Sequence, residues 1–230
     1  MTTVTLLQPR KLVLGCGALE ECKRYLAAGG FRRILIVTAP PLASVAQAFA
    51  EVPGSVIYDR IDREPTFAMF EALLAEARAL RPQAVVGLGG GSVLDVAKLA
   101  AALADGAQQI SEVLGIGRLA ARSAFLACLP TTSGTGSEVS PNAILLDTSD
   151  RLKKVVISPH LVPDAAYMDP LLARGMPPAV TASSGMDALT HCIECYANRV
   201  AHPAVDLYAL EGIRLIGASL ERAFSTGDDL

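Results

Sequence analysis

Two side chains that could hold a metal ion lie four residues apart in SSGMDALTHCIECYAN, residues 183–198. Residues i and i+4 share one face of a helix, so the carboxylate of Asp187 and the imidazole of His191 can bind one divalent ion. HExxH zinc sites use the same spacing, with a nitrogen ligand where Asp187 stands. An Asp–His hydrogen bond would also satisfy this spacing, and two ligands do not complete a metal site. The pattern alone leaves both interpretations open.

The cysteines of the same segment do not supply the missing ligands. Cys195 follows Asp187 at i+8, about 12 Å along a helix axis, which is too far for one ion to hold both of them together with His191. Cys192 and Cys195 form a CxxC pair, but the second ligand pair of a structural zinc site does not accompany it. We interpret both cysteines as small apolar residues.

A glycine-rich stretch, LGGGSVLDVAK at residues 88–98, could hold a phosphate group. Its glycines, Gly89, Gly90 and Gly91, allow a tight turn and a close approach of the backbone to a ligand. Ser92 is expected to cap the following helix, with Asp95 as its capping-box partner. The free N–H groups and the positive end of the helix dipole then suit a pyrophosphate. The stretch matches neither the GxGxxG fingerprint nor a P-loop, and the alternative is a capped turn without a ligand.

A second donor-rich loop, PTTSGTGSEVS at residues 130–140, follows the next apolar strand. Eight of its eleven residues are Thr, Ser or Gly, which supply hydroxyl and backbone N–H donors at the same edge of the sheet. A polar surface connection would have a similar composition. Two such loops after two strands of one sheet favour a nucleotide that lies across both.

Strands alternate with helices over the first two thirds of the chain. Apolar, β-branched runs predict strands, and helical spacing of apolar residues predicts helices. The expected strands are 32–38, 55–59, 84–89 and 124–130, and the expected helices are 18–28, 66–80 and 93–104. This alternation predicts an α/β fold with a parallel, doubly wound sheet. Residues 142–147 and 151–157, joined by a turn, predict a β-hairpin.

From Pro177 onward the sequence contains only helix signals. We therefore expect two domains, a nucleotide-binding domain over residues 1–172 and the beginning of an all-helical domain over residues 173–230. Fewer than 60 helical residues make a thin second domain, so the helical part is expected to be incomplete.

The composition and net charge of the chain limit the kinds of partner and the cellular location that we expect for it. The 230 residues carry a net charge of −3, which gives no clustered positive field for a nucleic acid or an anionic membrane. The N-terminus does not resemble a signal peptide, and no apolar run reaches the roughly 18 residues of a spanning helix. An odd number of cysteines, five, indicates reduced thiols. We expect a cytoplasmic protein.

Four segments together resemble the iron-containing (group III) alcohol dehydrogenases. They are GGGSVLDVAK, PTTSGTGSEVSPNAIL, PDAAYMDP and SSGMDALTHCIECYAN, in this order and at this spacing. The resemblance covers essentially the whole chain. It implies a Rossmann-like domain that binds NAD or NADP, followed by a helical domain that carries the metal, in a dehydroquinate synthase-like architecture.

The resemblance also implies roles for particular residues. Asp187 and His191 match the first two of four metal ligands, one Asp and three His, and the other two histidines lie beyond the end of this sequence. The chain is thus expected to be an N-terminal portion of a longer enzyme. Carried across by position, the residues that contact the cofactor are Gly89, Gly90, Gly91, Ser92, Asp95, Thr131, Thr132, Thr135 and Lys153.

Two departures from the family pattern concern the cofactor. Ala39 stands where many NAD-using members have an Asp after the strand ILIVT, so a 2′-phosphate meets no repulsion there. Arg32 or Arg33 is a candidate to bind this 2′-phosphate. The use of NADP is therefore an alternative hypothesis to the use of NAD. The usual PNPT segment reads REPT, which places Glu64 where an Asn lies near the cofactor.

The implied reaction is hydride transfer between NAD(P) and a small alcohol or aldehyde, with Fe²⁺, or alternatively Zn²⁺, polarising the substrate oxygen. No side chain stands out as a general base, so none is assigned a catalytic role. The alternatives are a non-catalytic nucleotide-binding fragment and a relative of the same fold, such as glycerol dehydrogenase or maleylacetate reductase. An apolar face left by missing helices would favour association into a homodimer.

Overall fold

The computed structural model describes residues 3–228, which form two compact units. One unit comprises residues 7–131 and 137–169, and the other comprises residues 3–6, 132–136 and 170–228. The first unit is built on a parallel sheet and the second on helices.

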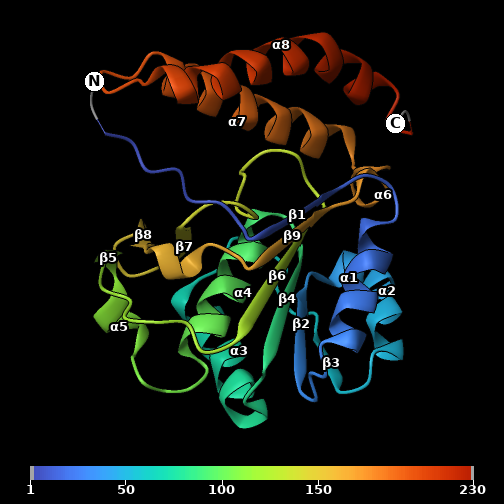
Figure 1. Ribbon diagram of the computed structural model, residues 1–230, viewed down its shortest axis with the longest axis vertical. Helices are drawn as coiled ribbons and strands as arrows, with labels where there is room; N and C mark the ends of the chain where they lie inside the picture. Colours follow the sequence, from blue (N-terminus) through green and yellow to red (C-terminus); the bar gives the residue numbers. More distant parts are fainter. Residues whose placement is uncertain (1–2, 229–230) are drawn as a thin grey trace. The chain divides into compact units, whose positions relative to one another are not determined.

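The first unit contains a six-stranded sheet in the order β1-β9-β6-β4-β2-β3, and every neighbouring pair is parallel (Figure 1). Its strands are β1 (Lys11–Leu14), β2 (Ile34–Thr38), β3 (Ser55–Tyr58), β4 (Ala84–Gly89), β6 (Phe125–Pro130) and β9 (Ala165–Met168). Every residue of β2 and β4 is buried, because helices cover both faces of the sheet. This explains why these strands are continuous apolar runs.

The helices of this unit begin and end where the sequence supplies local signals. Those that cover the sheet are α1 (Ala18–Ala28), α2 (Ala43–Ala46), α3 (Phe67–Leu80) and α4 (Gly91–Leu103), with short 3-10 turns η1 (Pro40–Leu42) and η2 (Gln47–Glu51). Thr66 caps α3, and its hydroxyl accepts a hydrogen bond from the Met69 amide at 3.3 Å. Phe70 and Leu73 of α3 are fully buried in the core that α3 and α4 build against the sheet.

A second, three-stranded sheet packs beside α4. It consists of β5 (Gly115–Ile116), β7 (Asn142–Asp147) and β8 (Leu152–Ile157) in the order β5-β8-β7, with α5 (Ile110–Val113) before it and η3 (Pro159–Leu161) after it. Strands β7 and β8 are antiparallel, with Leu146 opposite Lys153. Ala143, Leu145 and Val156 are buried in the core, so one face of the hairpin is apolar.

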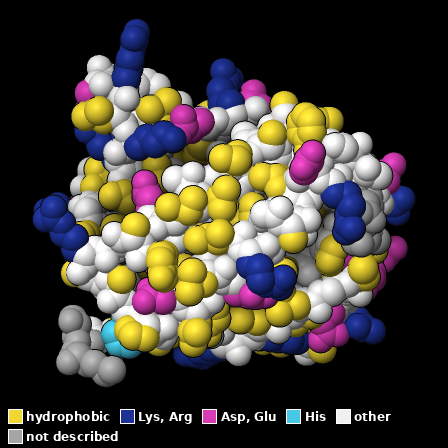
Figure 2. Space-filling view, turned by 90° about the horizontal axis from the view of Figure 1, so that it is seen from above, with side chains coloured by type: hydrophobic (Ala, Val, Ile, Leu, Met, Phe, Trp, Pro, Cys, Tyr) yellow, Lys and Arg dark blue, Asp and Glu magenta, His cyan; other side chains and the backbone are white. Residues whose placement is uncertain are grey.

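The second unit consists mainly of α6 (Pro170–Ala173), α7 (Pro178–Tyr196) and α8 (Pro203–Ser225). Helices α7 and α8 pack along each other, and Gly185 of α7 lies where a Cβ atom would collide with Leu220 of α8. Thr181 and Ala209 are the buried residues of the two helices, while many large apolar side chains are exposed, as the face over α8 shows (Figure 2). Within residues 3–228, no helix combines the length and apolar character that crossing a bilayer requires.

The structure confirms the predicted fold class, a parallel α/β sheet with a β-hairpin followed by helices. The sequence reading did not predict β1, β5 or β9. The expected Ser92 cap of α4 is wrong. Helix α4 begins at Gly91, one residue before Ser92, and Gly90 is its N-cap residue, without a side-chain hydrogen bond.

Candidate functional site

The sheet topology defines one edge as the place for a ligand. The chain leaves β2 toward β3 on one side, and it leaves β4 toward β6 on the other side. In open parallel sheets, ligands bind outside the carboxyl ends of strands where the connections diverge in this way. The turn that follows β4 at this point is Gly89–Ser92.

This turn presents backbone donors at the N-terminus of α4. The Gly90 carbonyl accepts hydrogen bonds from the amides of Val93 at 3.0 Å and Leu94 at 3.1 Å. The amides of Gly91 and Ser92 precede these bonds in the first turn, where N–H groups have no intrahelical acceptor. They and the positive end of the helix dipole suit an anionic group such as a pyrophosphate.

Gly89 is required for this geometry by its close packing. A Cβ atom at Gly89 would lie 2.7 Å from both Cβ and Cγ2 of Val93, in the first turn of α4. The Thr131 amide donates to the Gly89 carbonyl at 3.1 Å, so the residue that ends β6 lies beside the turn. The structure therefore brings Thr131 together with the glycine-rich turn.

Asp95 is directed into the protein. Its Oδ1 accepts from the Ser137 hydroxyl at 2.6 Å, and its Oδ2 accepts from the Ile144 amide at 3.0 Å. Burial raises the pKa of Asp95, although Lys98, Ser137 and the Ile144 amide oppose this shift. A direct contact of Asp95 with the cofactor remains a prediction. In the structure one carboxylate oxygen binds Ser137, within the second donor loop, and the other binds Ile144 of β7.

Lys153 forms an ion pair that the sequence did not suggest. Its Nζ lies 2.6 Å from Oε1 of Glu64, and both side chains are exposed. The backbone explains the pairing, because the Leu146 amide donates to the Pro65 carbonyl at 2.8 Å and Leu146 is opposite Lys153 in the hairpin. Glu64 lies in the connection after β3, at the same edge of the sheet as Gly89–Ser92. The residue that departs from the family pattern thus neutralises the lysine assigned to the cofactor.

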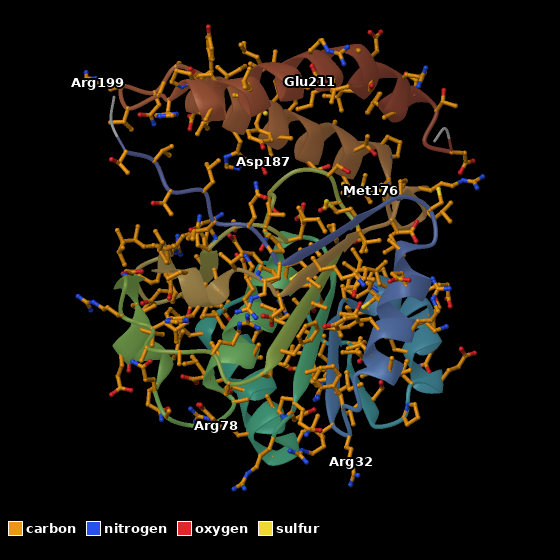
Figure 3. The ribbon with its side chains drawn as sticks, viewed as in Figure 1. Arg32, Arg78, Met176, Asp187, Arg199 and Glu211 are labelled. Carbon is orange, nitrogen blue, oxygen red and sulfur yellow. The ribbon has the colours of Figure 1, made fainter. Side chains whose placement is uncertain are left out.

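The suggestion that Arg32 or Arg33 assists a 2′-phosphate is wrong. Both precede β2 and lie at its amino end, about 13 Å along the strand from its carboxyl end. Figure 3 shows Arg32 at this end of the sheet. The Arg33 Nε donates to the Arg81 carbonyl at 2.7 Å, which holds it at that edge. At the carboxyl end, Ala39 leads into the 3-10 turn η1 and supplies no carboxylate.

The second unit holds the other predicted site residues. Asp187 and His191 lie on one face of α7, with Oδ1 and Nε2 3.5 Å apart and both side chains exposed. Loop 132–136, which carries Thr132 and Thr135, packs against the same helix: a Cβ atom at Gly134 would lie 2.9 Å from the Ser184 carbonyl oxygen.

The pair on α7 suits a divalent ion in its chemistry. A carboxylate oxygen and an imidazole nitrogen are ligands that Fe²⁺ and Zn²⁺ both accept. No cluster of three or more His, Cys, Asp or Glu side chains that could hold a metal occurs in the described part of the chain. Asp187 and His191 as metal ligands stay a prediction, which requires further ligands beside these two.

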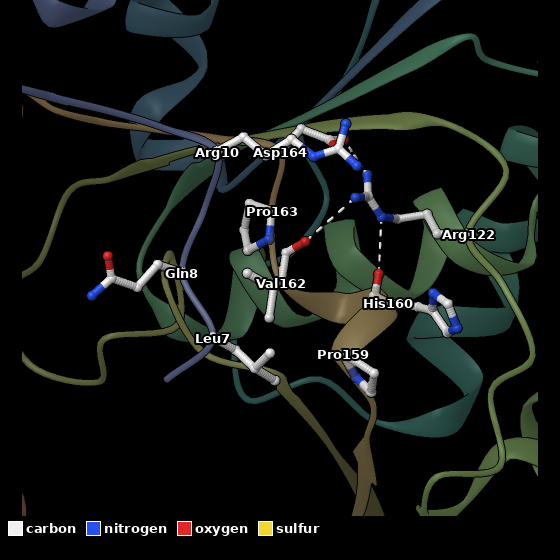
Figure 4. Close-up of a pocket in the computed structure, with 9 residues that line it drawn as sticks. All are labelled: Leu7, Gln8, Arg10, Arg122, Pro159, His160, Val162, Pro163 and Asp164. Atoms are coloured by element: carbon white, nitrogen blue, oxygen red, sulfur yellow. Dashed lines mark hydrogen bonds and ion pairs between the residues drawn. The ribbon is translucent and has the colours of Figure 1, made fainter. Parts of the chain in front are cut away.

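A polar hollow of about 360 Å³ lies at the amino ends of β6 and β9 (Figure 4). Arg122, one of the two arginines that line it, already donates to the carbonyls of His160, Ala124 and Val162 at 2.9, 2.8 and 3.3 Å and to Asp164 at 2.5 Å. Its guanidinium is used for internal bonds. The hollow is thus a structural junction at the edge opposite to the ligand edge.

The doubly wound parallel sheet with a donor-lined turn where its connections diverge is the arrangement of Rossmann-like proteins, and a helical unit accompanies it here. The chain belongs to the iron-containing alcohol dehydrogenase family: the family profile, described as iron-containing alcohol dehydrogenase, matches residues 9–170. The profile of the family's C-terminal region matches residues 181–230.

Individual relatives agree with this assignment. The chain is 36% identical over 222 residues to alcohol dehydrogenase 4 of Saccharomyces cerevisiae, covering 94% of this chain and 58% of that protein. The solved alcohol dehydrogenase from Oenococcus oeni is similar with a TM-score of 0.92 and 27% identity, over 98% of this chain and 61% of that chain. A sulfoacetaldehyde reductase from Bifidobacterium kashiwanohense, solved in complex with NAD⁺, is similar with a TM-score of 0.89 and 27% identity, over 100% of this chain and 62% of that chain. The chain thus spans about three fifths of the length of these relatives.

Proposed function

We propose that this chain is the dinucleotide-binding and initial metal-binding part of an oxidoreductase that interconverts a small alcohol and its aldehyde with NAD. The observation that carries the proposal is the turn Gly89–Ser92, which places helix N-terminal donors at the divergence point of the sheet. Similarity to a reductase solved with NAD⁺ supports it. We assign nucleotide binding to residues 1–172 and the start of the metal-binding domain to residues 173–230.

The residues of this chain have separate roles in binding the dinucleotide and the metal ion. When bound, the nicotinamide exchanges a hydride with the substrate carbon, and a divalent ion, Fe²⁺ or alternatively Zn²⁺, polarises the substrate oxygen. The amides of Gly91 and Ser92 hold the pyrophosphate, and Thr131 lies beside them at the end of β6. Asp187 and His191 are two ligands of the ion. Thr132 and Thr135 are further donors to the dinucleotide.

Further aspects of the proposal follow from the exposed surface and the thiols. All five cysteines are free, which suits a reducing cytoplasm. Exposed apolar side chains on α7 and α8 favour association, with a homodimer as the simplest assembly. The net charge of −3 does not favour a nucleic acid as a partner.

The experiment that tests the function is a titration of the purified chain with NADH and, in parallel, NADPH, followed by cofactor fluorescence. We expect NADH to bind with a Kd in the micromolar range, about 8 kcal/mol of binding free energy. Because Ala39 leaves the end of β2 without a carboxylate, NADPH should bind within roughly tenfold of NADH. Absence of binding of both cofactors at millimolar concentration would contradict the proposal.

A turnover assay separates the oxidoreductase from a non-catalytic nucleotide-binding fragment. The chain is mixed with Fe²⁺, NADH and a short aldehyde, and oxidation of NADH is recorded. Binding without turnover would support the fragment alternative, because two protein ligands hold an ion weakly.

Neutralising Glu64 should tighten dinucleotide binding. In Glu64→Gln the carboxylate no longer pairs with Lys153, so the ammonium is free to interact with the negatively charged cofactor. The pair is exposed, and we expect a modest decrease of the NADH Kd, about two- to fivefold at low salt. Lys153→Met is the matched control and should weaken binding. If both variants bind NADH as the wild type does, neither side chain lies near the cofactor.

A further inference from the structure

Lys98 is a fully buried cation in a helix whose other buried residues are all apolar. It lies in the second turn of α4 and is 0% exposed. Its Nζ donates three hydrogen bonds, to the Ser140 carbonyl at 3.0 Å, the Ser140 hydroxyl at 3.1 Å and the Asn142 carbonyl at 2.8 Å. All three donors of the ammonium are therefore satisfied by one short stretch of chain.

Asp95 completes the attachment of this stretch to α4. It precedes Lys98 by one helical turn, with Oδ1 3.9 Å from the Lys98 Nζ. Its hydrogen bonds to the Ser137 hydroxyl and the Ile144 amide hold the two ends of the stretch that Lys98 holds in the middle. Two side chains of α4 thus bind four positions within residues 137–144.

Burial of these charges is costly, which argues against an incidental arrangement. Desolvation lowers the pKa of Lys98 and raises the pKa of Asp95 and of Glu138, while the attraction between the ammonium and the carboxylates opposes these shifts. An apolar side chain at position 98 would fit the rest of the helix and avoid this cost. In exchange for this unfavourable desolvation, the hydrogen bonds of Lys98 and Asp95 hold residues 137–144 in a defined position on α4.

Hydrogen bonds also fix the two residues that flank loop 132–136, the central part of the second donor loop. Thr131 is bound to Gly89 at the start of loop 132–136, and Ser137 is bound to Asp95 at its end. The two residues that flank the loop are therefore bound to the turn and helix that carry the amides of Gly91 and Ser92.

We propose that Lys98 is a positioning residue of the nucleotide site, which holds residues 137–144 on α4 and thereby fixes the point at which the chain returns from loop 132–136 to the sheet unit. This inference rests on the proposed dinucleotide binding. Lys98 does not touch the ligand edge itself; it acts through Ser140 and Asn142.

The test compares Lys98→Met with Leu99→Ala in the full chain. Leu99 is the next residue of α4, is fully buried in the core and has no bond to residues 137–144 among the described hydrogen bonds, so its truncation destabilises the same helix by a cavity. NADH affinity and amide hydrogen exchange are measured at a temperature at which both variants are folded. We expect Lys98→Met to raise the NADH Kd roughly tenfold or more and to speed exchange at residues 138–144. Leu99→Ala should leave the NADH Kd unchanged and should not speed exchange at residues 138–144 more than in the rest of the sheet unit.

A milder variant keeps the test usable if Lys98→Met does not fold. Ser140→Ala removes one of the three acceptors and should raise the NADH Kd by about two- to fivefold. Wild-type affinity and exchange in Lys98→Met, or an equal loss of affinity in Leu99→Ala, would overturn the proposal. If the wild-type chain binds no dinucleotide, the proposed function fails, and exchange at residues 138–144 alone decides whether Lys98 holds this segment.

Discussion

Gly89→Ala should raise the NADH Kd by roughly tenfold to a hundredfold. The added methyl group would lie 2.7 Å from Val93, which is β-branched and has little freedom to change its rotamer inside a helix. The first turn of α4 must then move away from β4, and the amides of Gly91 and Ser92 move with it. Fluorescence titration with NADH measures the affinity, and circular dichroism shows whether the variant is folded.

Gly217→Ala is the matched control. Gly217 lies inside α8, and a Cβ atom there meets nothing within 4 Å. The same substitution should raise the free energy of unfolding by about 0.5–1 kcal/mol, because alanine favours a helix, and it should not change NADH affinity. Wild-type affinity in a folded Gly89→Ala variant would show that this turn does not hold the pyrophosphate.

The sequence predicted those helices and strands whose burial requires a regular pattern of apolar residues. Strands β2 and β4 are covered on both faces and read as continuous apolar runs, and α3 and α4 show helical spacing of apolar residues. Strands β1 and β9 were missed because each is stabilised by pairing with the other, with Lys11 opposite Ala165. The two segments are far apart in the sequence, so no local pattern indicates this pairing. Neither short segment has a marked strand pattern of its own.

The sheet edge that we propose for the nucleotide could be identified from the sequence, but several of the contacts at this edge could not. A glycine-rich turn between an apolar strand and a helix indicates the ligand edge from sequence alone. The Glu64–Lys153 pair joins residues 89 positions apart through the register of the hairpin, which no local spacing encodes. Lys98 could have been recognised from the sequence, because a lone lysine within the apolar run of α4 indicates a buried cation. Arg32 and Arg33 were misplaced because the direction of β2 puts them at the other edge.

The expected cost of Arg122→Met is about 2–4 kcal/mol of unfolding free energy. The guanidinium joins the start of β6 to the segment before β9, where it contacts three carbonyls and the Asp164 carboxylate (Figure 4). Asp164 also accepts from the Leu126 amide at 2.9 Å, and its carbonyl accepts from the Lys11 amide at 3.1 Å. Removing the cation leaves a half-buried carboxylate without its partner at the point where β1, β6 and β9 begin.

Urea unfolding of Arg122→Met and Arg63→Met measures this cost against a matched surface change. Arg63 is 72% exposed and pairs with the exposed Asp62, so its replacement should cost less than about 1 kcal/mol. Because Arg122 lies at the amino ends of the strands, NADH affinity at a temperature where the variant is folded should equal that of the wild type. A loss below about 1 kcal/mol in Arg122→Met would show that water replaces the guanidinium at this junction. A loss of NADH affinity in the folded variant would instead show that the two edges of the sheet are coupled.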